Sequence, residues 1–241
     1  MPLPVPWGGE VLQVFWCPVD HETSNGPKPI LRWAAASGLP MRTNEVSGHQ
    51  PGNYVPRACA IHPESVLEYP TVHELTQNQL HEIRENLELA AIGEKYFPDH
   101  EDYEVAPGEM AYQNMFSAAP GTKIGGYGEW IQAAVSKQCA CGADMVLLLT
   151  IATDEWDIQT QFRWRPSELP HNRTNAQPSG LTLGDCGSVY VAYSWGSGRY
   201  YPLFSSSFRL KYPHVCTECP ARQFKNWRDA NQLHALLIVR C

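Results

Sequence analysis

Two pairs of cysteines have the side chains and the spacing that a metal site requires. Cys139 and Cys141 flank a single alanine, and Cys216 and Cys219 are separated by two residues. Structural zinc is held by about four ligands in a tetrahedron, and thiolates are its preferred ligands. We therefore expect one zinc ion bound by these four cysteines, with His214 as the alternative to one of them. Four thiolates leave no coordination position for water, so this zinc would stabilise the fold and take no part in catalysis.

Other interpretations of the cysteines stay open. The four could be unrelated reduced thiols that bind no metal. Cys17, Asp20 and His21 form a second group, in which a metal site or a Cys/His nucleophile pair competes with a core cysteine at a strand end. Gly142 follows Cys141 and suits the positive φ that a metal-binding turn often requires. The remaining cysteines are expected to be small buried hydrophobic residues: Cys59, Cys186 and Cys241.

Length and charge restrict the class of protein. The chain has 241 residues, of which 43% are hydrophobic, so it can bury a sizeable core. Its net charge of -7 argues against binding to nucleic acid, which requires a basic face. The charge is uneven: residues 62–109 contain twelve acidic and two basic residues, and residues 199–241 contain seven basic and two acidic ones. These parts either face each other, or the basic end meets an acidic partner.

The chain carries no obvious signal for export or for the membrane. Its first residues, MPLPVPWGGE, have neither the basic nor the apolar region of a secretory signal. No apolar run reaches the roughly 18 residues of a membrane span, and MVLLLTIA is short enough to be a buried strand. We therefore expect a cytoplasmic protein with no membrane partner. Its thiols would stay reduced there, which favours metal ligands or buried thiols over disulfides.

The first part of the chain predicts two strands and one helix. EVLQVFWCPVD, residues 10–20, is typical of a strand whose pattern breaks at Pro18, and PILRW is expected to pair with it. Residues 38–56 are rich in Gly, Pro, Asn and Ser and indicate a loop. Residues 76–96 predict a single helix, capped by Thr76 with Gln79 as its capping-box partner. One face of this helix is apolar and contains Leu80, Ile83, Leu87 and Ala91.

After Pro107 the pattern indicates antiparallel sheet. Turn signals occur at Gly125–Gly126, Gly142, Gly184–Asp185 and residues 196–198. The segments between them are strand candidates: residues 129–135, 145–152, 160–165, 188–195 and 207–212. The fold class is therefore α+β and predominantly antiparallel β.

Three blocks of this region, KIGGYGEWIQ, CACGADMVLLLTIA and LGDCGSVYVAY, resemble the bacterial YwqG-like family of unknown function. VLQVFWCPVDH and YVPRACAIHPE look like the actinobacterial members of that family. The family is related to programmed cell death protein two and its relatives, which are chaperones of a small-subunit ribosomal protein. In this sequence Gln138 stands at the first cysteine position of the family's knuckle, so Cys139 would serve in its place, and Gly128 replaces a usual proline.

The resemblance implies two similar β lobes with one clear helix between them, within a single domain of residues 1–241. The N-terminal β lobe would cover about residues 1–72 and the helix about 76–97. The C-terminal β lobe, with the zinc knuckle, would cover about 104–241. The resemblance implies no catalytic activity, because none is established for the bacterial members.

The function expected from these features is a non-catalytic protein-binding or chaperone-like module with a structural zinc site. One alternative is an enzyme of unknown reaction with a metal or Cys/His site. A second alternative is an immunity-type protein that neutralises one partner. The sequence contains no GxSxG elbow, P-loop, dinucleotide fingerprint or HExxH helix, which favours binding over catalysis.

The segment GSVYVAYSWGSGRYYPLF predicts a hairpin that supplies a peptide-binding edge. Residues 188–195 alternate in size, and the glycines at 196 and 198 allow a tight turn. Pro202 would confine the returning strand to a sheet edge, where a partner peptide could add as a further strand. The residues expected to bind it are Tyr200, Tyr201 and Phe204. Trp195 is expected to be buried and at least one of the two tyrosines exposed; alternatively, these aromatics cover the core or contact another subunit.

Overall fold

The structure, a computed structural model, describes a large part of the chain. Of strands β2, β6 and β7 it gives the course of the backbone alone. The described residues are 11–21, 26–34, 54–57, 59, 64–99, 104–130, 142, 144–166, 176–183, 187–194, 199–205 and 238–240.

The first sheet has the order β2-β1-β7. Strands β1 (Val11–His21) and β2 (Gly26–Ala34) pair antiparallel, which confirms the predicted pairing of the two N-terminal strands. Strand β1 continues past the predicted break at Pro18 and runs to His21. The register is irregular between Cys17 and His21, where Pro18 has no N–H to donate. Strand β7 (Ile238–Arg240) pairs with β1 in parallel, a pairing that the sequence pattern did not predict.

The second sheet is antiparallel, with the order β3-β4-β5-β6. Its strands are β3 (Lys123–Ile124), β4 (Met145–Ala152), β5 (Ser188–Ser194) and β6 (Arg199–Ser205). The predicted strands at 145–152 and 188–195 and the returning strand after the hairpin are thus confirmed. Among the described strands, β6 stands at one end of the sheet order, as predicted. Of the other strand candidates, 207–212 lies outside the described residues, and Glu129 and Trp130 lie in no helix or strand.

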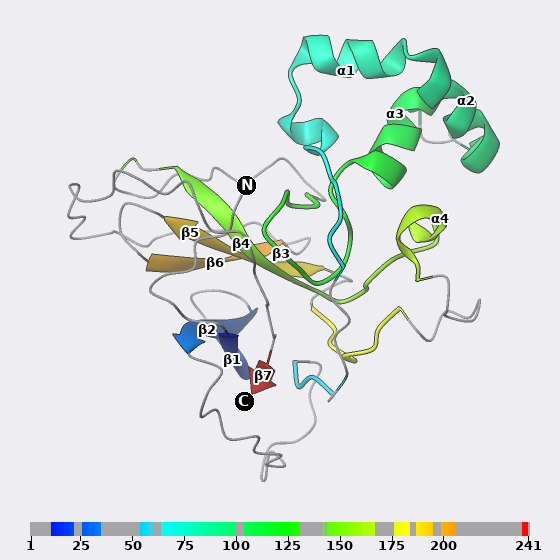
Figure 1. Cartoon of the computed structure of the whole chain (residues 1–241). Coiled ribbons are helices and arrows are strands. Elements are labelled where there is room, and N and C mark those ends of the chain that lie inside the picture. Colours follow the sequence, from blue (N-terminus) through cyan, green and yellow to red (C-terminus); the bar gives the residue numbers. More distant parts are fainter. Residues whose placement is uncertain are drawn as a thin grey trace.

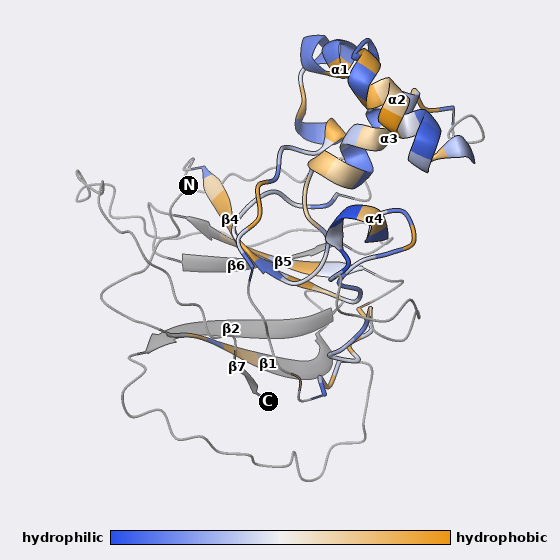
Figure 2. Cartoon of the chain, turned by 45° about the vertical axis from the view of Figure 1, so that its right-hand side comes forward, coloured by the Kyte–Doolittle hydropathy of each residue, from blue (hydrophilic) through white to orange (hydrophobic). Residues whose placement is uncertain are grey.

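The main hydrophobic core lies between the two sheets. Leu12 and Val14 of β1 pack with apolar side chains of β4 and β5, and Figure 2 shows β1 running below these two strands. The shared cluster also contains Leu148, Leu149, Ile151, Leu181, Leu183, Val189 and Val191. Val189 and Val191, on the face of β5 that the sequence predicts to carry large apolar groups, are therefore part of the core. Each fully buried Val, Leu or Ile contributes about 1.5–3 kcal/mol. Tyr190 and Ala192, on the opposite face of β5, are buried as well.

A group of short helices lies beside the sheets (Figure 1). It contains η1 (Val72–Glu74), α1 (Gln77–Arg84), α2 (Leu87–Tyr96), α3 (Pro107–Ala111) and the π-helical turn η3 (Tyr112–Phe116). The cap predicted for α1 is confirmed: Gln79 N–H donates to Thr76 Oγ1 at 3.3 Å, and Thr76 N–H donates to Gln79 Oε1 at 2.9 Å.

The prediction of one continuous helix over 76–96 is wrong. The helix ends at Arg84, and Asn86 caps a second helix by accepting a hydrogen bond from Leu89 N–H at 3.0 Å. An asparagine side chain competes in this way with the helix interior and favours a helix start. The break changes the apolar face as well, because Leu87 is 85% exposed.

Helices α1, α2 and α3 approach one another at two glycines, Gly93 of α2 and Gly108 of α3. A Cβ on Gly93 would lie 2.0 Å from the carbonyl oxygen of Pro107, and a Cβ on Gly108 would lie 2.7 Å from that of Ile83. Neither distance is compatible with a larger residue unless the backbone moves. The two glycines therefore let the three helices pack with their backbones in contact.

The predicted strand at 160–165 is wrong, since the structure has helix α4 (Gln161–Trp164) there. The Asp157 carboxylate accepts hydrogen bonds from the backbone N–H groups of Gln159 and Thr160, at 2.7 and 2.8 Å. Gln161 N–H donates to the Asp157 carbonyl at 2.9 Å, which closes a helical turn. These local hydrogen bonds favour a helical turn over the strand that the alternating pattern of residues 160–165 predicts. Among the described residues, no helix has both the length and the apolar character to cross a membrane.

Candidate functional site

The predicted zinc ligands lie outside the described residues: Cys139, Cys141, Cys216, Cys219 and the alternative ligand His214. Gly142 has a φ of 81°, which confirms the glycine-favoured conformation predicted after Cys141. Within the described ranges, no group of three or more His, Cys, Asp or Glu residues could hold a metal ion. The zinc site stays a prediction.

The other cysteine predictions have mixed outcomes. Cys17 and His21 are described by their backbone in β1 alone, so a second metal or nucleophile site there stays a prediction. The expected burial of Cys59 is wrong: this cysteine is a free thiol on the surface, in a stretch without helix or strand. Cys186 and Cys241 lie outside the described residues.

The predicted peptide-binding edge can be followed along its backbone. Tyr200 pairs with Tyr193, Tyr201 with Ala192, and Phe204 with Val189. Ser194 pairs with Arg199, so the predicted hairpin around 196–198 joins adjacent antiparallel strands. Trp195, and the exposure of the two tyrosines, lie outside what the structure describes. Successive positions of a strand alternate between the faces of its sheet, so Tyr200 and Tyr201 occupy opposite faces.

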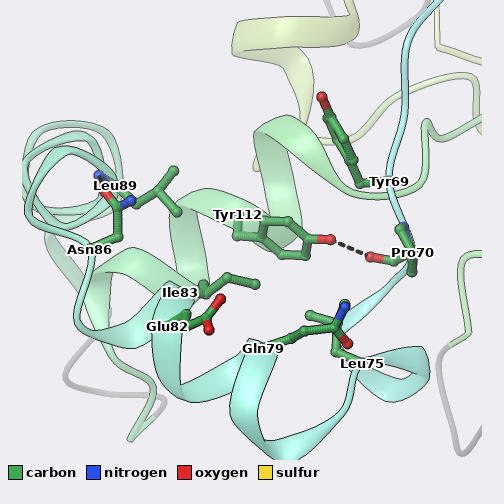
Figure 3. Close-up of a pocket in the computed structure, with 9 residues that line it drawn as sticks. All are labelled: Tyr69, Pro70, Leu75, Gln79, Glu82, Ile83, Asn86, Leu89 and Tyr112. Atoms are coloured by element: carbon green, nitrogen blue, oxygen red, sulfur yellow. Dashed lines mark hydrogen bonds between the residues drawn. The ribbon is translucent and has the colours of Figure 1, made fainter.

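A cavity of about 330 Å³ lies between the chain entering the helices, helix α1 and η3. Figure 3 shows its lining: Tyr69, Pro70, Leu75, Gln79, Glu82, Ile83, Asn86, Leu89 and Tyr112. Gln79, Glu82 and Asn86 are exposed, so the cavity opens to solvent. In α1, Gln79 precedes Glu82 by three residues and Ile83 by four, which brings these side chains to one side of the helix; Asn86 caps the start of α2.

Tyr112 fixes one wall of the cavity. Its hydroxyl donates a hydrogen bond to the carbonyl oxygen of Pro70 at 2.7 Å, as Figure 3 shows. Burial, with smaller contributions from Tyr127, Tyr69 and Glu74, raises the pKa of Tyr112 to about 12. The hydroxyl therefore stays protonated at neutral pH and continues to donate to Pro70. This bond holds the extended segment 64–70 beside the helices.

Segment 64–70 forms an apolar rim next to the cavity. Val66, Leu67 and Tyr69 are 41%, 71% and 46% exposed. The backbone of Tyr69 donates to the carbonyl oxygens of Phe116 and Ser117, at 3.2 and 3.5 Å. Among the described residues, no backbone group of residues 64–68 pairs with another backbone group. Residues 64–68 therefore combine exposed apolar side chains with backbone groups that pair with no other backbone group of the described residues.

Glu68 anchors this segment to the second sheet. Its carboxylate accepts hydrogen bonds from the N–H groups of Ala119 and Tyr127, both at 2.6 Å, and from Lys123 Nζ at 2.7 Å. The Glu68 and Lys123 side chains are only 9% and 13% exposed. Gly126 has a φ of 74°, and a Cβ there would collide with the Glu68 carboxylate. Glycine is therefore required for this close approach.

A second carboxylate lies near this anchor. Burial raises the pKa of Glu129 to about 7; the charges of Asp157 and Glu68 act in the same direction and that of Lys123 opposes them. Burial also lowers the pKa of Lys123, which Glu68 partly offsets. The Tyr190 hydroxyl donates to the Glu129 carbonyl oxygen, and Trp130 packs on the Tyr190 ring with centroids 4.8 Å apart.

Opposed pKa shifts of this kind are typical of acid–base sites. Here, however, the cavity is lined by other residues, and Lys123 is engaged by Glu68. We therefore interpret the Glu68–Lys123 pair as the support of segment 64–70. The cavity lining contains one carboxylate, that of Glu82, and no Cys, His or Lys, so it has no paired nucleophile and base. Its geometry suits binding of a side chain from a partner.

The sequence pattern did not identify this cavity. The sequence feature that points to it is SVLEYP, residues 65–70, where three apolar residues interrupt an acidic stretch before the helix. Comparison of the chain with family models, curated proteins and solved structures finds no match.

Proposed function

We propose that the chain is a non-catalytic protein-binding or chaperone-like module, and that segment 64–70 and the adjoining cavity form its binding surface. The observation that carries the proposal is the joint exposure of Val66, Leu67 and Tyr69 in a segment whose Tyr69 and Pro70 line the cavity. Neighbouring apolar side chains exposed together mark interaction sites, whereas isolated ones are ordinary.

The backbone of residues 64–68, which pairs with no other backbone group among the described residues, supports the same proposal. An extended segment with free N–H and C=O groups can pair with a strand of a partner, while adjacent pockets take its side chains. The hydrogen bonds from Ala119 N–H to the Glu68 carboxylate and from the Tyr112 hydroxyl to the Pro70 carbonyl hold the segment in one conformation in the absence of a partner. A surface held in its binding conformation loses less conformational entropy on association.

We propose strand β6 as a second binding edge, with Tyr200, Tyr201 and Phe204 as its partner-binding residues. Its support is the position of β6 at the end of the sheet order among the described strands. An unpaired strand edge is a template for an added peptide.

We also propose one structural zinc ion, held by Cys139, Cys141, Cys216 and Cys219, with His214 as an alternative ligand. Its support is the spacing of the cysteines and the positive φ of Gly142. A cytoplasmic location would keep these thiols reduced and available to the metal.

Affinity capture with the full chain tests the binding function. We expect one protein to copurify in stoichiometric amount, identified by mass spectrometry. The double variant Leu67→Ser/Tyr69→Ala should reduce the captured amount at least about fivefold, as expected for apolar residues at the centre of an interface. Phe15→Ala is the matched control, since Phe15 is an exposed aromatic residue of β1, in the other sheet. Equal capture by wild type, double variant and control would contradict the surface. Absence of any stoichiometric partner would contradict the function.

A further inference from the structure

Three glutamates border the helical side of the cavity: Glu82 lines it, and Glu85 and Glu88 directly precede the lining residues Asn86 and Leu89. Glu82, Glu85 and Glu88 are all exposed, and within the described ranges none of them forms an ion pair. Arg84 does not neutralise them, because its Nε lies 2.6 Å from Glu109 Oε2, and that carboxylate is only 12% exposed. Arg84 is therefore drawn towards the α1–α3 contact.

Lys95 is the one lysine of these helices, and it does not neutralise the cavity either. It belongs to the last turn of α2, and its Nζ lies 4.6 Å from the centre of the Tyr96 ring. The three glutamates lie in α1, in the connection after it and in the first turn of α2. The cavity therefore carries an acidic rim on its helical side.

The wall of the cavity combines this acidic rim with an apolar surface. Figure 3 shows Glu82 beside Ile83, with Leu89 and the Tyr112 ring on the neighbouring walls. Apolar walls with a few placed polar groups are the usual composition of a ligand site. A bound residue would bury an apolar group against these walls, while positive charges on either side of it would meet the glutamates.

We propose that the cavity binds an extended segment of a partner protein in which a large apolar residue is flanked by lysine or arginine. This rests on the proposed binding function and names the chemistry of the partner. The apolar residue enters the cavity, the segment lies along residues 64–70, and the basic side chains contact Glu82 and Glu85. Such rim charges mainly increase the association rate and the selection of partners, and salt screens them.

Synthetic peptides test this chemistry directly. The probes are fluorescein-labelled and have the central sequences KKWKK, EEWEE and KKGKK between glycines. We expect the full chain to bind KKWKK at least about tenfold more tightly than either of the others at about 50 mM salt, and to lose much of that preference at about 500 mM. Equal affinity for KKWKK and EEWEE would overturn the proposal, and so would equal affinity for KKWKK and KKGKK.

Variants of the acidic rim locate the binding. Glu82→Gln/Glu85→Gln should weaken KKWKK binding about fivefold, as expected for two exposed charge pairs. Asp99→Asn, the same chemical change beyond the end of α2, should leave the affinity unchanged. The melting temperature checks folding of each variant. If the double variant does not fold, Gln79→Lys tests the same rim and should also weaken binding.

The remaining outcomes separate this inference from the proposed function. A captured partner that Leu67→Ser/Tyr69→Ala loses but Glu82→Gln/Glu85→Gln retains would overturn the basic-segment chemistry and leave the binding function intact. Self-association of the full chain in sedimentation experiments, abolished by the glutamate variant, would assign the cavity to a second copy and overturn the inference. Failure to capture a partner, combined with no peptide binding, would overturn both.

Discussion

Glu68 and Glu129, two carboxylates near the second sheet, have different surroundings. Glu68 receives two backbone N–H groups and the Lys123 ammonium, so its negative charge is stabilised by three donors. Glu129 has no side-chain hydrogen bond to the described residues, and burial raises its pKa to about 7. Glu68 is therefore held by hydrogen bonds from three donors, whereas burial makes the charged form of Glu129 less favourable.

Glu129 should make the stability depend on pH. Its pKa is raised from 4.5 to about 7, so between these values the folded protein binds more protons than the unfolded chain. Its stabilising contribution is complete below about pH 4.5 and is lost as the pH rises through 7, by at most about 3 kcal/mol before solvent screening. Urea unfolding at about pH 5.5 and pH 8 should show lower stability at the higher pH.

Glu129→Gln should reduce this pH dependence because it removes the titrating group. A smaller slope of the same sign remains, since burial also raises the pKa of Glu155. Glu129→Ala removes the same carboxyl and should flatten the profile in the same way. Identical profiles for wild type and both variants would show that Glu129 does not contribute.

At the scale of the elements, the contact between α2 and α3 depends on Gly93. Alanine is normally the better helix former by about 1 kcal/mol, but a Cβ here would lie 2.0 Å from the Pro107 carbonyl oxygen. Gly93→Ala should therefore destabilise the protein by about 2 kcal/mol, measured by urea unfolding.

The control for Gly93→Ala is the reverse replacement, Ala91→Gly, at an exposed position of the same helix. It should cost only about 1 kcal/mol, which is the difference in helix propensity. A stabilising effect of Gly93→Ala would mean that α2 and α3 do not pack through this glycine.

The sequence predicts those elements whose own residues determine them. The apolar residues of β4 and β5 pack in the core, and their pattern in the sequence predicts both strands. The capping box of Thr76 and Gln79 predicts the start of α1. The break at Asn86 and the turn at Asp157 were missed, because a single side-chain cap outweighs the surrounding periodicity. The parallel pairing of β7 with β1 joins opposite ends of the chain and has no local signal.

At the scale of the whole molecule, the cavity results from the meeting of separate segments. Pro70, Ile83 and Tyr112 belong to the extended segment, to α1 and to η3, and the hydrogen bond from Tyr112 to Pro70 joins residues 42 positions apart. A pattern within one window of sequence does not contain this arrangement. The expected division into two similar β lobes likewise stays a prediction, although the described strands form two sheets.

The proposed zinc site would join distant parts of the chain, because its predicted ligands come from two segments far apart in the sequence. Protein purified without a His tag and without added zinc should contain about one equivalent of zinc, measured by metal analysis. Cys216→Ser should release the metal and lower the melting temperature, since structural zinc binding contributes directly to folding. Less than about a tenth of an equivalent in the wild type would contradict the site.

Strand β4 has a consequence for how the protein reaches its folded state. MVLLLTIA has no charge, proline or glycine, and in the fold seven of its eight residues are buried between β3 and β5. Uncharged apolar segments of this length form intermolecular β-sheet readily while they are exposed. Strand β4 pairs with β5, which begins at Ser188, so this pairing forms only after a long stretch of chain has folded back. A single charged residue, Asp144, directly precedes β4 and can limit its pairing with other chains. Folding of this chain therefore competes with aggregation through the same segment that later forms its core.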